Sequence, residues 1–294
     1  MRLGFFADGG WSHLSFDALM GTPGISVEFV CARFQQPDHI LRERAEKHNI
    51  PFLIHKDINS AEFLSTLDCY KCDLLVSMSF DQIFREPIIT RPRLGVINCH
   101  AGKLPFYRGR NILNWALIND EKEFGITVHY VNQGVDTGDI IRQKCYPISD
   151  EDNYGTLLDR AFVGCADLLV ESIVDISSGV VRRRTQREIH RFGSYCSARG
   201  PGDEYINWNQ SSRQIFNFVR AICPPGPSAR CFNNEREVRV RHVEFLKDAP
   251  CYIGIPGAVL SRDFGGLLVK TADSFVRLLD WEAEEKIRVG DRLS

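Results

Sequence analysis

The chain has 294 residues, of which 44% are hydrophobic, and its formal net charge is −2. This length and hydrophobic fraction are enough for at least one full core, and they favour two domains. A charge so near neutrality excludes a chain-wide basic field of the kind that holds nucleic acid without regard to its sequence. We therefore do not expect a nucleic acid partner.

Ten cysteines are scattered through apolar segments rather than spaced as a disulfide framework. They are typical of small buried thiols in a reducing compartment. The stretch CYKC at 69–72 has no second cysteine pair and no His at ligand spacing, which predicts a structural role and no metal site. The amino terminus lacks the apolar region of a signal peptide, and no apolar run is long enough to span a bilayer. These features predict a cytoplasmic protein with no membrane partner.

Over the first hundred residues, short apolar runs alternate with longer amphipathic ones. The runs that predict strands, with a turn between the first two, are LGFFA (3–7), ISVEFVCA (25–32), PFLI (51–54), DLLVSM (73–78) and GVINCH (95–100). The longer segments are DHILRERAEKHN (38–49), SAEFLSTLDCY (60–70) and DQIFREPIIT (81–90). Strands that alternate with helices predict an α/β domain with a mostly parallel, Rossmann-like sheet. Ligands of such sheets gather at the carboxyl ends of the strands.

The pattern changes in the second half of the chain. GITVHYVN (125–132) and DIIRQKCYPI (139–148) predict an antiparallel addition to the sheet, and residues 153–176 predict a long helix that ends at SSG. Residues 182–204 are rich in Arg, Gly, Ser and Pro, which is typical of a linker, although their basic run could also be a phosphate patch. Residues 205–294 predict one helix followed by a small OB-like β-barrel. The expected organisation is a catalytic domain (1–181), a linker (182–204) and a smaller carboxyl-terminal domain (205–294).

One polar pair lies at the end of the last parallel strand, in NCHAGKLPFYRGR (98–110). Alternate side chains of a strand face the same way, so Asn98 and His100 project to one side and Cys99 to the other. The Gly- and Pro-containing loop that follows ends the strand, which places the pair at the carboxyl edge of the sheet. Either residue could also be a turn former or a hydrogen-bonded core group.

A third polar group lies in the turn GVDTGD (134–139), where Asp136 is placed to approach the same edge. A plain hairpin turn is the alternative. Aspartic protease chemistry is excluded, because it needs a second such carboxylate and the chain has no second DTG or DSG. An Asp that orients a His is the better use of this residue.

The stretches NCHAGKLPFYRG and GITVHYVNQGVDTGDI resemble the active-site signature of the formyltransferases that use 10-formyltetrahydrofolate. EYINWNQSSRQIFNFVRAICPPGPSA resembles the start of the carboxyl-terminal domain shared by methionyl-tRNA formyltransferase and the sugar formyltransferases. The resemblance spans nearly the whole chain and is strongest over residues 94–142. It implies that Asn98, His100 and Asp136 are catalytic, with Asn98 and protonated His100 stabilising an oxyanion, His100 acting as the base and Asp136 raising its basicity.

The same resemblance implies where the two substrates bind. The pterin of 10-formyltetrahydrofolate would lie against an apolar set and the backbone of the nearby turn, namely Met78, Phe80, Ile83, Phe84, Asp139 and Ile140. The loop after the catalytic strand would face the acceptor through Lys103, Tyr107 and Arg108. The alternative for the apolar residues is that they belong to the core.

The acceptor is suggested by two departures from the transfer-RNA enzyme. The chain lacks the basic insertion that follows the second strand there. In the first loop, Trp11, Ser12 and His13 stand where those enzymes carry a Gly-Thr-Pro turn, and Gly10, Trp11 and Ser12 are expected to bind the substrate, although Trp11 could simply pack against the first helix. These features favour a nucleotide-linked amino sugar. Methionyl-tRNA formyltransferase, a formyltetrahydrofolate hydrolase and a folate-binding protein without turnover are the alternatives. By analogy with sugar formyltransferases, we expect a homodimer.

Overall fold

The computed structural model describes residues 1–263 and 265–294, and the chain divides into two compact units. Unit 1 consists of Met1–Gly109, Phe124–Tyr146 and Asp159–Cys196. Unit 2 consists of Arg110–Glu123, Pro147–Leu158 and Ser197–Ser294. The domain boundaries at residues 181 and 204 stay a prediction, but residues up to Cys196 cluster with unit 1 rather than standing apart from it.

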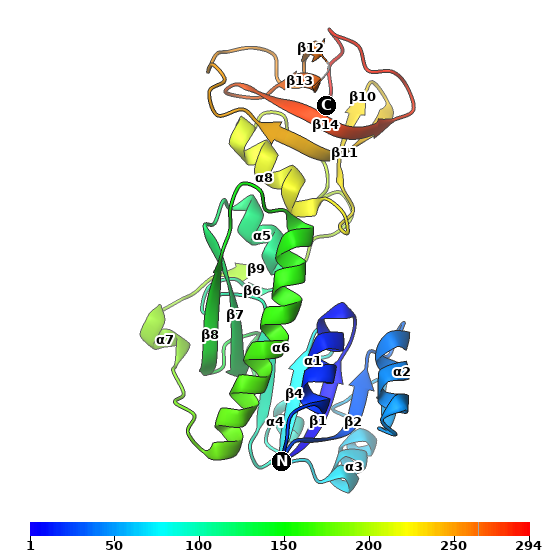
Figure 1. Ribbon diagram of the computed structural model, residues 1–294, viewed down its shortest axis with the longest axis vertical. Coiled ribbons are helices and arrows are strands. Elements are labelled where there is room, and N and C mark those ends of the chain that lie inside the picture. Colours follow the sequence, from blue (N-terminus) through cyan, green and yellow to red (C-terminus); the bar gives the residue numbers. More distant parts are fainter. Residues whose placement is uncertain (264) are drawn as a thin grey trace. The chain divides into compact units, whose positions relative to one another are not determined.

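Unit 1 is built on a seven-stranded sheet in the order β3-β2-β1-β4-β5-β7-β8 (Figure 1). The strands are β1 (Arg2–Ala7), β2 (Ser26–Ala32), β3 (Phe52–Ile54), β4 (Leu74–Met78), β5 (Val96–His100), β7 (Glu123–Tyr130) and β8 (Ile140–Pro147). The first five pair in parallel and β7 pairs antiparallel to β5. Nearly every residue of β1 and β4 is buried, as near-continuous apolar strands of a parallel sheet require. The predicted Rossmann-like sheet is thus confirmed.

The helices of unit 1 are α1 (Gly10–Met20), α2 (His39–Lys47), α3 (Ala61–Tyr70), α4 (Glu86–Ile89), most of α6 (Tyr154–Ser178) and α7 (Gln186–Ile189). Successive side chains of β5 point to opposite faces of the sheet, one toward α3 and the other toward α6. Val96 packs in one cluster with Phe63 of α3, whereas the Cys99 thiol lies 3.7 Å from the Cys165 carbonyl oxygen of α6. Asn98 and His100 therefore face away from Cys99, as the alternation predicts. No helix in the described ranges is long and apolar enough to cross a membrane.

The segment between β1 and β2, which we expected to be a turn, forms the 11-residue helix α1. Its buried stripe contains Ser12 and Ser15 beside Phe16 and Leu19. The two serines interrupt the apolar periodicity that predicts a helix, which is why the sequence pattern is weak here.

Unit 2 combines helices α5 (Ile112–Ile118) and α8 (Ser212–Ile222) with a five-stranded antiparallel sheet. The strands, in the sheet order β10-β11-β14-β13-β12, are β10 (Ala229–Asn233), β11 (Arg236–Phe245), β12 (Val259–Asp263), β13 (Gly266–Lys270) and β14 (Phe275–Ala283). Leu293 bridges to Asn233 of β10, and Arg292 bridges to Ala258 beside β12. The carboxyl-terminal residues thereby connect the two edges of the sheet, which confirms the predicted helix and OB-like barrel.

Candidate active site

The loop after β5 leaves the edge of the sheet along a path fixed by hydrogen bonds. Thr127 on β7 is the register partner of His100, and its hydroxyl donates to the Gly102 carbonyl oxygen (2.6 Å). The Gln143 amide donates to the Leu104 carbonyl oxygen and to the Thr127 hydroxyl, both at 2.8 Å. These buried contacts hold residues 101–105 against the sheet, so the end of β5 has a defined geometry.

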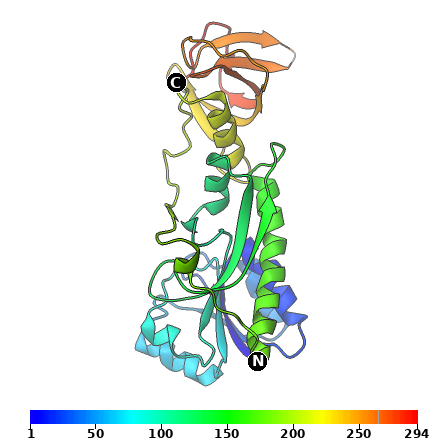
Figure 2. The same ribbon diagram turned by 90° about the vertical axis from the view of Figure 1, so that its left-hand side faces the viewer.

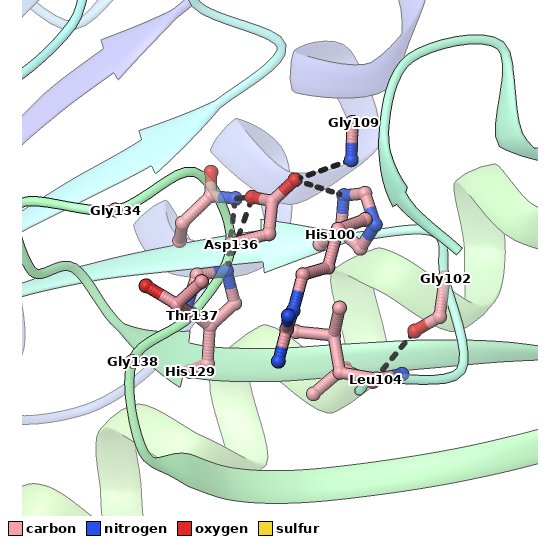
Figure 3. A network of polar contacts seen from close by, with 12 residues as sticks. His100, Gly102, Leu104, Gly109, His129, Gly134, Asp136, Thr137 and Gly138 are labelled. Carbon is pink, nitrogen blue, oxygen red and sulfur yellow. Dashed lines mark hydrogen bonds and ion pairs between the residues drawn. The ribbon is translucent and has the colours of Figure 1, made fainter. Parts of the chain in front are cut away.

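The Asp136 carboxylate is the centre of a polar cluster at this edge (Figure 3). Its Oδ2 accepts a hydrogen bond from the Gly109 backbone N–H (2.8 Å) and lies 3.7 Å from His100 Nδ1. Its Oδ1 lies 3.5 Å from Asn98 Nδ2 and 3.5 Å from His129 Nε2. The structure thus brings together the three side chains predicted to be catalytic, and it adds His129, which the sequence analysis missed.

His129 is the register partner of Asn98 across the β5–β7 pair. Its Nδ1 donates to the Tyr130 carbonyl oxygen (2.8 Å), so Nε2 is the nitrogen that faces Asn98 Nδ2 at 3.3 Å and Asp136 Oδ1 at 3.5 Å. A signal for this residue exists in the sequence: Thr127 and His129 are polar at alternate positions of an otherwise apolar strand, so both face the side of Asn98. His129 is 2% exposed, so it contacts Asn98 from within the protein interior.

His100 is 8% exposed, and both of its ring nitrogens face protein groups. Nε2 donates to the Tyr107 carbonyl oxygen (2.7 Å), so Nδ1 is the nitrogen that faces Asp136. Burial lowers the pKa of His100 below its ordinary value of 6.5, although the Asp136 carboxylate and the Tyr107 carbonyl act in the opposite direction. Asp136 thus acts in the predicted direction, since it raises the pKa of His100, but burial outweighs it and the resting imidazole is neutral at neutral pH.

Asp136 remains ionised despite its burial. Burial alone would raise the pKa of this carboxyl, but His100, His129 and the Gly109 N–H together hold it well below its usual range. The residue has a left-handed backbone conformation (φ 52), which Asp tolerates better than most side chains. A non-glycine residue held in this region points to constraint by the surrounding structure.

Two family models match the sequence: the formyl transferase model over residues 9–173, and the model of the formyl transferase carboxyl-terminal domain over residues 200–290. The chain belongs to the formyl transferase family. A methionyl-tRNA formyltransferase of Azobacteroides pseudotrichonymphae is 33% identical over 85% of this chain and 78% of its own length. The methionyl-tRNA formyltransferase of Halothermothrix orenii is 32% identical over 95% of this chain and 92% of its own length.

Solved structures show the same formyl transferase fold. WlaRD, a sugar 3N-formyl transferase crystallised in the presence of dTDP and 5-N-formyl-THF, is 19% identical, with a TM-score of 0.72 over 98% of this chain and 99% of its own. An N-formyltransferase from Helicobacter canadensis, in complex with folinic acid and dTDP-3-aminofucose, is 18% identical, with a TM-score of 0.71 over 96% of this chain and 100% of its own. At these identities the likeness concerns the fold alone.

The first loop of this formyl transferase places its predicted substrate residues in packing contacts. Trp11 packs edge-on against Phe162 of α6, with ring centroids 4.9 Å apart, and Gly10 lies close to the same ring. Ser12 is fully buried, and its hydroxyl donates to the Gly9 carbonyl oxygen (2.7 Å). This leaves no exposed Ser12 surface for a substrate, because the hydroxyl closes the first turn of α1.

The loop after β5 separates the three residues predicted to face the acceptor. Lys103 is half-buried, and Tyr107 contributes its carbonyl oxygen to His100. Arg108 is 7% exposed, and its guanidinium donates to Gln186 and to the Phe192 carbonyl oxygen. The Arg108 side chain is therefore occupied by protein groups rather than open to an acceptor, contrary to the expectation from sequence.

Of the apolar residues predicted to hold the pterin, two are buried and two have accessible surface. Met78 and Phe84 are buried, at 1% and 6% exposure, and Phe84 packs on Phe6 in the core. Phe80 is half-buried and Ile83 is 67% exposed, so these two have surface to offer a flat ring.

The backbone of the nearby turn is partly paired as well. The Asp139 carbonyl oxygen accepts from the Tyr130 N–H, and Ile140 exchanges both its backbone hydrogen bonds with Arg184. Within the ranges that the structure describes, no three His, Cys, Asp or Glu side chains are arranged to hold a metal ion.

Proposed function

We propose that this formyl transferase moves the formyl group of 10-formyltetrahydrofolate to the amine of a nucleotide-linked amino sugar. The observation that carries the chemistry is the cluster of Asn98, His100 and Asp136 at the carboxyl edge of the sheet. The Asp136 carboxylate lies 3.5 Å from Asn98 Nδ2 and 3.7 Å from His100 Nδ1. The cluster joins an amide donor, a neutral imidazole and an ionised carboxylate, which are the groups that acyl transfer to an amine needs.

Attack of the amine on the formyl carbon produces a tetrahedral intermediate with a negative oxygen. Asn98 Nδ2 is the donor for this oxygen, and such a donor typically contributes roughly 100-fold to 1,000-fold in rate. Its present contacts with His129 and Asp136 are long, at 3.3 and 3.5 Å. Catalytic hydrogen bonds often reach their final geometry only in the complex with substrate.

His100 is the base in this proposal. Its neutral Nδ1 takes the proton of the attacking nitrogen, and the resulting imidazolium is stabilised by Asp136 Oδ2, which lies 3.7 Å away. As the intermediate collapses, the bond between the formyl carbon and the folate nitrogen breaks, and the same proton passes to that nitrogen. The products are the formamide and tetrahydrofolate, and His100 is neutral again.

The sugar acceptor is supported by the short, anchored connection between β2 and α2, which spans only Arg33–Asp38. The Asp38 side chain accepts from the Leu41 N–H to cap α2, and Arg33 Nη2 donates to the Ser79 carbonyl oxygen (2.6 Å). A connection held in this way provides no arm to reach a transfer RNA. The net charge of −2 also fits a small acceptor. WlaRD was crystallised in the presence of dTDP and 5-N-formyl-THF, and the Helicobacter canadensis N-formyltransferase in complex with folinic acid and dTDP-3-aminofucose, which makes dTDP-amino sugars the first to test.

Methionyl-tRNA is the second candidate acceptor, because the 32–33% identical relatives act on it. The deciding experiment incubates the full chain with 10-formyltetrahydrofolate and, separately, a panel of nucleotide-linked amino sugars or methionyl-tRNA. The proposal expects one amino sugar to gain the mass of a formyl group. Formylation of methionyl-tRNA alone, with binding that weakens steeply with salt, would assign the second acceptor. Formate release without any amine would indicate a hydrolase.

A further inference from the structure

Residues 186–196, here called the strap, fold back onto the catalytic loop of unit 1 (Figure 2). The strap begins with α7 and ends with the short strand β9 (Tyr195–Cys196), which pairs in parallel with β6 (Arg108–Gly109). The Ser194 N–H donates to the Pro105 carbonyl oxygen, and the Arg108 N–H donates to the Ser194 carbonyl oxygen, both at 3.1 Å. A segment whose composition is typical of a linker is therefore bonded to the loop that follows the catalytic strand.

Gln186 is a strap side chain that contacts both the backbone of the turn carrying Asp136 and the side chain of Arg108. It is 3% exposed. Its Nε2 donates to the carbonyl oxygens of Asp136 (2.7 Å) and Gly138 (2.8 Å). Its Oε1 accepts from Arg108 Nε (3.0 Å) and Nη2 (2.6 Å). Both donors and both acceptor positions of the amide are used, so its orientation is fixed.

The Gln186 amide bonds the turn that carries Asp136, a turn that is partly exposed. Gly134 and Val135 are exposed, and Asp136 itself has the left-handed conformation described above. The peptide after Asp136 and the Gly138 carbonyl are fixed by the Gln186 amide, whereas Arg108 immediately precedes Gly109, whose N–H donates to Asp136 Oδ2. Gln186 thus ties the backbone that carries the carboxylate to the backbone that donates to it.

Arg108 completes this arrangement. Its Nη1 donates to the Phe192 carbonyl oxygen (3.0 Å) and to the Tyr195 hydroxyl (3.1 Å), and its guanidinium lies 5.1 Å from the centre of the Tyr195 ring. The planar guanidinium fork fits this set of acceptors, which a Lys ammonium could not span. The guanidinium therefore joins Gln186, at the start of the strap, to Phe192 and Tyr195 near its end.

We propose that Gln186 is a positioning residue, which sets the Asp136 carboxylate at its working distance from His100. The inference rests on the proposed catalytic role of Asp136. A misplaced carboxylate would stabilise the imidazolium less well, so loss of the Gln186 amide should lower kcat and leave the KM for 10-formyltetrahydrofolate nearly unchanged. Displacements of about 1 Å at a catalytic group can cost up to ~100-fold, and we expect a loss of roughly 10-fold to 100-fold.

The test compares Gln186→Met, which keeps the volume and removes the hydrogen bonds, with Arg187→Met, an exposed neighbour in the same short helix. The first measurement is the NMR titration of the His100 ring in the full chain without substrate. Asp136 raises the pKa of His100, whereas burial and His129 lower it. A loosened Asp136 should therefore lower the pKa of His100 in Gln186→Met and leave it unchanged in Arg187→Met. This measurement needs no acceptor, so it stands even if the proposed sugar is wrong.

The second measurement is a double-mutant cycle on kcat with Asp136→Asn. If Gln186 acts through Asp136, Gln186→Met should add less than about twofold in the Asp136→Asn background. A full multiplicative loss there, or a His100 titration that equals that of the parent, overturns the proposal. If Gln186→Met does not fold, as judged by circular dichroism, Arg108→Lys is titrated instead, because it keeps the charge and loses the guanidinium fork. An unchanged His100 titration in Arg108→Lys would then overturn the proposal.

Discussion

Asn98 on β5 and His129 on β7 are opposite each other in the sheet, and the Asn98 amide donates to His129 Nε2 at 3.3 Å. Strand β7, which pairs antiparallel to β5, therefore contributes to the site as well as to the sheet. It supplies a buried imidazole whose second nitrogen is fixed by the Tyr130 carbonyl oxygen. The proposed oxyanion donor is thus oriented by the neighbouring strand.

His129→Phe tests that orientation. The substitution keeps a buried ring and removes the acceptor for the Asn98 amide, so we expect kcat to fall by roughly 10-fold, with a smaller change in KM. Steady-state formyl transfer measures this. His39→Phe, at an exposed position of α2, is the matched control and should retain the parent rate. A His129→Phe enzyme as fast as the parent would show that Asn98 needs no such partner.

Asn98→Ala and His100→Ala should each lower kcat at least ~100-fold while the protein stays folded. The reason is that one removes the oxyanion donor and the other removes the base. Cys99→Ser lies between them on the same strand and is the matched control. Its side chain faces α6, where a hydroxyl can still donate to the Cys165 carbonyl oxygen, and we expect near-parental activity. Inactive but folded Cys99→Ser would contradict the assigned faces of β5.

The pH dependence of kcat should have its acid limb below pH 6.5. His100 works as a base only when it is neutral, and its pKa is lowered below that value, mainly by burial. Activity is therefore retained as the pH falls through 6.5 and is lost only when the pH passes the lowered pKa. In Asp136→Asn the carboxylate that raises the pKa of His100 is removed, so the acid limb should move further down while the plateau rate falls at least ~100-fold. An acid limb that moves upward in this variant would contradict the assignment.

Gly102→Ala should reduce activity through His100. A Cβ at this position would lie 2.4 Å from His100 Nε2 and 2.5 Å from the Tyr107 carbonyl oxygen, which are the two atoms of one hydrogen bond. The ring or the loop must shift, and we expect kcat to fall by at least ~10-fold. Gly21→Ala is the control, because its Cβ would meet only ordinary contacts of 3.6 Å and more. Equal activities of the two variants would show that the loop accommodates the methyl group.

Much of unit 1 could be predicted from the sequence because its strands are apolar runs with polar groups at their ends. Asn98 and His100 follow from alternation in one strand, and the turn that carries Asp136 is marked by its glycines. His129 could have been found by the same alternation, but a single His within an apolar strand carries little weight unless its partner across the sheet is known.

The strap and α1 show where sequence patterns fail. The strap is held by backbone hydrogen bonds, by the buried Gln186 amide and by the Arg108 guanidinium, and none of these contacts produces hydrophobic periodicity. In α1, Ser12 and Ser15 occupy buried positions that an apolar stripe would fill. Arg108 and Ser12, which we predicted to bind substrate, were hard to place for a related reason: the Arg108 side chain binds a protein group distant in sequence, and the Ser12 hydroxyl binds the end of its own helix.

The two peptide groups that touch the catalytic cluster from the loop are the Tyr107 carbonyl and the Gly109 N–H. Since both belong to the main chain, neither contact is made by a side chain. A position such as Phe106, whose side chain makes neither contact, is consequently a place where evolution, or a designer, could retune the choice of amine while leaving both contacts in place.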